Sequence, residues 1–158
     1  MATLTKANPR VVEGHMETTS LLVANGTSWN AGQFLHTVSG ALTVSASDAV
    51  NFKYYALTTQ ADPGNATTYA EVGVITNDIV FEGNELDATS AVATWKGLLC
   101  GIDVTSNIVT VDTGEVTNTS VVVEDVGFLY EPLKNNATET YPLVKFRVAQ
   151  STLDAAGS

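Results

Sequence analysis

Residues 34–59 (FLHTVSGALTVSASDAVNFKYYALTT) decide the fold class, because they hold three short β-like runs in succession. Breaks at Ser39-Gly40 and at Ser47-Asp48 separate the runs. Apolar side chains occupy every second position of the later two runs: Leu42, Val44, Ala46, Val50, Phe52, Tyr54 and Ala56. A period of two puts successive side chains on opposite faces of a strand. The stretch therefore predicts antiparallel strands over a shared core.

The third of these runs carries large apolar side chains on both faces. Phe52 and Tyr54 fall on one face, and Tyr55 and Leu57 fall on the other. A strand of this kind is either buried between two layers or lies at a contact between subunits. We predict the second arrangement, with an interface formed by Trp29, Tyr55 and Leu57.

Strand-like runs also recur through the rest of the chain. Residues 69–75 and 79–81 are predicted to pair across a turn at residues 76–78, and residues 101–111 to form a hairpin that turns at residues 105–107. Further strands are predicted at residues 20–24, 121–123, 127–130 and 143–149. Val92, Trp95 and Leu99 are at helical spacing, which makes residues 90–100 the one helix candidate.

These patterns predict a mainly β protein, an antiparallel β-sandwich or a β-barrel-like domain with at most one short helix. Residues 1–19 lack a sustained alternation and are predicted to be an extended N-terminal arm. The β-rich domain is predicted over residues 20–150, and a flexible C-terminal tail over residues 151–158.

The charge is strongly acidic and unevenly spread. The net charge is −10, and eleven carboxylates lie between residues 71 and 131 against one base, Lys96. Such a surface repels phosphate backbones, so we expect no nucleic-acid partner. No apolar run approaches the roughly 18 residues that a membrane span needs, so we expect no membrane partner either.

The residues that usually carry catalysis or bind metals are sparse. There is no G-x-S-x-G motif, the lone Cys100 lies in an apolar stretch, and His15 and His36 are far apart in the sequence. We therefore expect no enzymatic activity, no cofactor and no metal site. Oxygen-rich loops at residues 77–78 and 82–87 leave calcium as an alternative. Stacking of a sugar on Trp29 or Trp95 is a second alternative.

In its layout the chain resembles the small decoration (cement) proteins that coat tailed-phage capsids. The resemblance covers residues 3–130 loosely. It rests on a polar N-terminal arm and on four later stretches: NGT…AGQFL (25–35), VSGAL (38–42), AEVGVI (70–75) and GIDV…IVTVD (101–112). The stretch after Tyr130 matches no part of that layout.

The resemblance implies a β-rich protein without enzymatic activity, made in the host cytoplasm and placed on the outer surface of the capsid. Its implied partners are the major capsid protein and two further copies of itself, in a homotrimer. The arm would contact the capsid through Thr3, Leu4, Thr5, Lys6, Asn8, Arg10, Val11 and Val12. It follows that a chain lacking residues 2–14 should fold but not bind capsids. The alternative function is a carbohydrate- or host-binding β-sandwich module of a phage tail or surface appendage.

Overall fold

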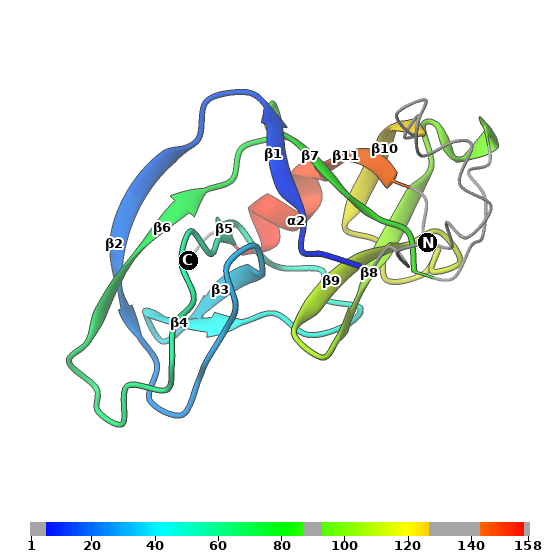
Figure 1. Cartoon of the computed structure of the whole chain (residues 1–158). Helices are drawn as coiled ribbons and strands as arrows, with labels where there is room; N and C mark the ends of the chain where they lie inside the picture. Colours follow the sequence, from blue (N-terminus) through cyan, green and yellow to red (C-terminus); the bar gives the residue numbers. More distant parts are fainter. Residues whose placement is uncertain (1–5, 87–92, 127–142, 157–158) are drawn as a thin grey trace, which may run out of the picture.

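In the computed structural model of the chain, which describes residues 6–86, 93–126 and 143–156, the strands form two layers. The first layer is a six-stranded sheet and the second is a closed barrel (Figure 1). The sheet contains, in spatial order, β1 (Arg10–Glu13), β7 (Val80–Asn84), β11 (Leu143–Val148), β10 (Val121–Val126), β8 (Leu99–Thr105) and β9 (Ile108–Asp112). The barrel contains β2 (Glu17–Val23), β4 (Ala41–Val44), β3 (Phe34–Val38), β5 (Tyr54–Tyr55) and β6 (Tyr69–Val74).

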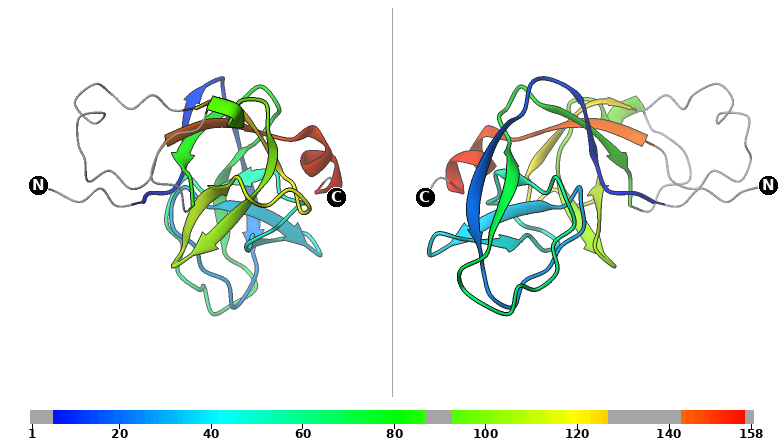
Figure 2. Two further views of the ribbon diagram at one scale, coloured as in Figure 1. Left: turned by 90° about the vertical axis from the view of Figure 1, so that its right-hand side faces the viewer. Right: turned by 60° about the vertical axis from the view of Figure 1, so that its left-hand side comes forward.

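The predicted fold class is confirmed. Strands dominate, and their neighbours pair antiparallel except for the parallel pair β2 and β4. The α-helix of the described residues is the short α2 (Gln150–Ala155). Figure 2 shows β11 running along the top of the molecule and leading into α2 at its side.

Two apolar cores follow from this layering. The smaller core fills the barrel with Val23, Trp29, Leu35, Leu42, Ala56 and Val72. The larger core lies under the six-stranded sheet and includes Phe81, Val144 and Phe146. Phe34 and Leu35 are neighbours in β3, yet Phe34 belongs to the larger core and Leu35 to the barrel core. The alternation of a single strand therefore joins the two layers.

The third run of residues 34–59 forms a much shorter strand than its pattern predicts. Only Tyr54 and Tyr55 are in the ladder, where they pair with β3 and β6. Tyr54 packs against the barrel core, and Tyr55 packs against the larger core. The apolar bulk on both faces therefore reflects burial between two layers of one chain, which is the first of the two arrangements considered for it.

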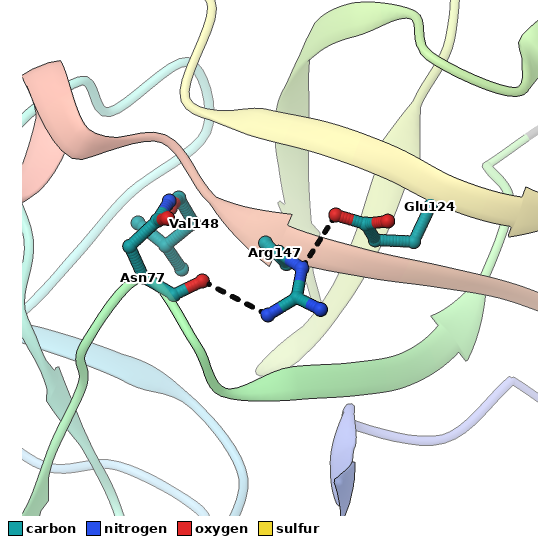
Figure 3. Close-up of polar contacts among 4 residues, drawn as sticks. All are labelled: Asn77, Glu124, Arg147 and Val148. Carbon is teal, nitrogen blue, oxygen red and sulfur yellow. Dashed lines mark hydrogen bonds and ion pairs between the residues drawn. The ribbon is translucent and has the colours of Figure 1, made fainter. Parts of the chain in front are cut away.

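The predicted hairpin of residues 69–75 with 79–81 is wrong. β6 pairs with β2 and β5 in the barrel, whereas β7 pairs with β1 and β11 in the sheet, so the chain crosses between layers here. Figure 3 shows how the crossing is held: Arg147 of β11 donates to the Asn77 carbonyl at 3.2 Å and to Glu124 at 2.5 Å. The Asn77 side-chain amide donates to the Val148 carbonyl at 3.2 Å. Local alternation cannot distinguish such a crossing from a turn.

Both predicted ends of the domain also need correction. Residues 10–13 and 17–19 are not an arm, because β1 pairs with β7 and β2 pairs with β6. Residues 151–156 are not a flexible tail, because α2 buries Thr152 and Leu153 and places Leu153 against the larger core. A helix of six residues is shorter than two full turns, so its apolar face repeats too few times to stand out in the sequence.

Two other predictions have clear outcomes. The hairpin of residues 101–111 is confirmed, with a two-residue turn at Ser106 and Asn107, whose φ angles of 52° and 63° are those of a type I′ turn. The helix candidate at residues 90–100 is mostly wrong. Its described part is a single 3-10 turn (Ala93–Trp95) followed by Gly97 at φ 85° and then β8. Residues 90–92 and the strand predicted at residues 127–130 lie outside the described residues.

Candidate functional site

The predicted binding arm begins, in the described residues, with a segment that is bound along its length to the rest of the chain. We call residues 6–13 the N-terminal segment. The Lys6 ammonium donates to the Leu86 carbonyl at 2.5 Å, and the Ala7 backbone N–H donates to Asn84 Oδ1 at 2.9 Å. Both contacts fix the segment beside the end of β7.

Asn8 connects the segment to both layers. Its side-chain amide donates to the carbonyl of Ala31, in the loop before β3, at 3.1 Å, and to the carbonyl of Asn107 at 3.0 Å. Its Oδ1 accepts from the Val109 backbone N–H at 2.8 Å. One side chain therefore satisfies three backbone groups, and the Val109 N–H is on the outer edge of β9. This edge is blunted by Asn8 and is not open for strand addition.

The next two residues continue the attachment. Pro9 is buried, and its carbonyl accepts from the Tyr55 hydroxyl at 2.5 Å. Burial raises the pKa of Tyr55, so the phenol stays protonated and keeps donating at neutral pH. Arg10 pairs with the nearly buried Glu82 at 2.6 Å. The segment thus contacts β5 in the barrel and β7 in the sheet.

The predicted capsid-binding residues therefore divide into two groups. Lys6, Asn8 and Arg10 are engaged within the chain, Val11 packs against the larger core, and Val12 is half-buried. Thr3, Leu4 and Thr5 lie outside the described residues. The sequence missed the internal role of the segment because its partners, from Ala31 to Val109, are distant in sequence.

The predicted subunit interface is not supported at two of its three residues. Trp29 is 2% exposed inside the barrel and donates to the Thr58 carbonyl at 3.0 Å, so it has no free face for a second subunit or for a sugar. Tyr55 is held by Pro9 and packs against Phe34 and Phe81. Leu57 is exposed and stays a candidate contact.

The barrel carries an exposed feature that the sequence did not reveal. Val38, Ala41, Leu22 and Tyr69 are paired in register across β3, β4, β2 and β6. Directly paired residues share a face, and their neighbours Leu21, Leu42 and Ala70 contact the barrel core, so these four point outward. We call them the apolar row. Val38 and Tyr69 are 55% and 65% exposed, and Leu22 and Ala41 are half-buried.

Two shallow hollows lie elsewhere on the described surface. One, of about 220 Å³, is lined by Lys6, Leu86, Asp103, Thr105, Ser106, Ile108 and Thr110 on the outer face of the β8–β9 hairpin. Another, of about 310 Å³, is lined by His15, Glu17, Val74, Thr76 and Asp78. Each hollow holds a threonine hydroxyl that donates to a carboxylate: Thr105 donates to Asp103 at 2.6 Å in the first, and Thr76 donates to Asp78 in the second.

Cys100 and the described carboxylates of the loops considered for calcium are engaged in internal contacts. Cys100 is fully buried, and burial together with the nearby Asp112 and Glu85 raises the pKa of its thiol to about 12. Among the described residues no three His, Cys, Asp or Glu side chains are grouped as metal ligands. In the loops considered for calcium, Asp78 accepts from Thr76, Glu82 from Arg10, and Glu85 from Thr113. Asp87 lies outside the described residues.

One substitution tests how closely the N-terminal segment fits the barrel. Gly32 has φ 93°, and a Cβ there would lie 2.5 Å from the Asn8 Cβ. Gly26 has a similar φ of 85° but open space around it. We expect Gly26→Ala to cost about 1–2 kcal/mol for its backbone conformation alone. Gly32→Ala should cost about 1–3 kcal/mol more, because Asn8 must also move. Urea unfolding of both variants measures the difference, and equal costs would contradict the close fit.

Comparison with known proteins leaves the family open: no family model, no curated protein and no solved structure matches the chain. Within the described ranges, none of the helices has the length and apolar character needed to cross a membrane.

Proposed function

We propose that the chain is a structural virion protein that binds the outer surface of a tailed-phage capsid and stabilises the shell, as a homotrimer. Its partners are the major capsid protein and other copies of the chain. The proposal starts from the resemblance in layout described above. By bridging neighbouring capsid subunits, such a protein adds interface area to a shell that must resist internal pressure.

The observation that carries the proposal is the use the chain makes of its polar side chains. Asn8 joins the loop before β3 of the barrel to β9 of the sheet, and Asn77 holds the crossing between the layers to Val148. Arg10 pairs with Glu82 across β1 and β7 within the sheet. Glu85 and Arg147 likewise hold turns and crossings in place. These groups brace a rigid body, which is what a protein that reinforces a shell requires.

The alternative of carbohydrate binding loses its main support. Trp29 is enclosed in the barrel, and Trp95 is half-buried against the larger core. A sugar stacks on an exposed aromatic face, which Trp29 does not offer, so the alternative rests on the half-buried Trp95 alone. We therefore place the structural function first.

The test is to add the purified protein to empty, expanded shells assembled from the major capsid protein encoded beside its gene. We expect a regular outer lattice in cryo-electron microscopy images and a higher temperature of shell disruption. A variant lacking residues 2–5 measures the contribution of Thr3, Leu4 and Thr5. Shells that stay bare at saturating protein concentration would overturn the proposal.

A further inference from the structure

The free end of the barrel carries an exposed strip of apolar side chains, the apolar row defined above. It crosses the end of β2 and the start of β6, which lie at the lower left of Figure 1 on the side away from the six-stranded sheet. Neighbouring strands are about 4.8 Å apart, so a row over four strands is about 14 Å wide. Single exposed apolar residues are ordinary, but a contiguous row of them marks an interaction surface.

The surroundings of the row have the composition of a protein–protein interface. In the paired register, the outward positions of these four strands that reach the surface are Thr18, Ser20, Leu22, His36, Val38, Ala41, Thr43, Tyr69 and Glu71. The next position, Gly73, is buried beneath Met16. Hydroxyl side chains therefore border a centre of Tyr, Val, Leu and Ala. Interfaces likewise have an apolar centre enriched in Tyr, depleted of charged residues and surrounded by a polar rim.

The charges around the row indicate which partner it fits. Of those nine surface positions only Glu71 is charged at neutral pH, because burial lowers the pKa of His36 and keeps its ring neutral. Asp62 lies in the loop that adjoins the turn after β2, where it accepts from the Gly26 N–H. A basic partner does not fit this nearly uncharged row. It would be drawn instead to the acidic remainder of the chain, whose net charge is −10.

We propose that the apolar row is the surface through which one copy of this chain binds a second copy. Two chains of net charge −10 repel each other, and the repulsion is least where the facing surfaces carry almost no charge. Contact between two such rows buries apolar surface on both copies and leaves no charge unpaired at the centre. Contact of one row with a second gives a twofold dimer, so in the proposed homotrimer three rows face one another about the threefold axis. For the number of copies the inference rests on that proposed function.

Sedimentation equilibrium of the full chain and of three variants tests the inference. Tyr69→Glu and Val38→Glu each put a charge into the row, whereas Val116→Glu puts the same charge at a position that is 63% exposed and outside the row. We expect the full chain and Val116→Glu to self-associate. Tyr69→Glu and Val38→Glu should weaken association at least tenfold. Added salt should strengthen association of the full chain by screening the repulsion. Circular dichroism spectra confirm that the variants are folded.

Each result decides the matter. A full chain that stays monomeric at millimolar concentration overturns the inference, as does equal association of Tyr69→Glu and Val116→Glu. A third result would assign the row to the capsid and overturn the self-contact. In that result both the full chain and Tyr69→Glu are monomeric, and the full chain coats shells whereas Tyr69→Glu does not. A full chain that associates through the row but leaves shells bare upholds the inference and refutes the proposed function.

Discussion

A chain that lacks residues 2–14 is expected not to fold. The deletion removes β1 from the edge of the six-stranded sheet, together with the hydrogen bonds of Lys6, Ala7 and Asn8 to distant parts of the chain. It also leaves the Tyr55 hydroxyl without its partner Pro9, and the nearly buried Glu82 without Arg10. At about 1 kcal/mol for each hydrogen bond, the loss is at least about 5 kcal/mol. A domain of this kind has a net stability of about 5–15 kcal/mol.

Far-UV circular dichroism and thermal unfolding of three variants measure this effect. A chain lacking residues 2–5 keeps every contact described for the N-terminal segment and should unfold at the temperature of the full chain. The stability of Asn8→Ala should lie between that of the full chain and that of the chain lacking residues 2–14. The substitution leaves the Val109 N–H on the β9 edge without its acceptor. Equal unfolding temperatures for the full chain and for the chain lacking residues 2–14 would contradict the role of the segment.

This result replaces the expectation from sequence that a chain lacking residues 2–14 folds and merely fails to bind. It also changes the experiment on the capsid. Loss of binding by the longer deletion would report unfolding, so only the deletion of residues 2–5 tests contact through Thr3, Leu4 and Thr5. The remaining predicted contacts, from Lys6 to Val12, cannot be removed without disturbing the fold.

The sequence predicted the features that depend on alternation and on turn residues, which are the buried face of a strand and the position of a hairpin turn. The period of two in residues 41–44 and 143–148 reflects one buried face for each strand, and Ser106-Asn107 sits where a type I′ turn is needed. Both properties are local, so they can be read without knowing which strand lies beside which.

The sequence did not predict which strands pair or which contacts join the layers. Residues 69–81 look like a hairpin, yet β6 and β7 belong to different layers. Asn8 reads as a polar arm residue, yet its acceptors are the carbonyls of Ala31 and Asn107, and its donor is the Val109 N–H. The apolar row is likewise assembled from four strands whose order only the barrel establishes. Topology of this kind depends on the sum of long-range contacts and leaves no local signal.

Phe34→Ala is expected to be the most damaging single substitution, because Phe34 joins the two layers. Its ring is fully buried, stacks on Phe52 with centroids 4.7 Å apart, and meets the edge of Phe81 at 5.2 Å. Phe52 comes from the barrel side and Phe81 from the sheet. Truncating a buried Phe to Ala costs about 3–5 kcal/mol. For a chain of this size that lowers the unfolding temperature by roughly 6–20 °C. Val116→Ala, at an exposed loop position, should change stability by less than about 0.5 kcal/mol.

The two tryptophans show whether the layers unfold together. Trp29 lies inside the barrel and Trp95 packs against the larger core, so Trp95→Phe and Trp29→Phe chains report the barrel and the sheet separately. Phe34 contacts the rings of Phe52 and Phe81, which come from the two layers. We therefore expect the two fluorescence transitions in urea to coincide, and both to shift together in the Phe34→Ala background. Leu35→Ala removes the next side chain of β3 from the barrel core and serves as the comparison. Separate transitions for Trp29 and Trp95 in the otherwise unaltered chain would mean that the aromatic contact does not couple the layers, and Phe34 would then be an ordinary core residue.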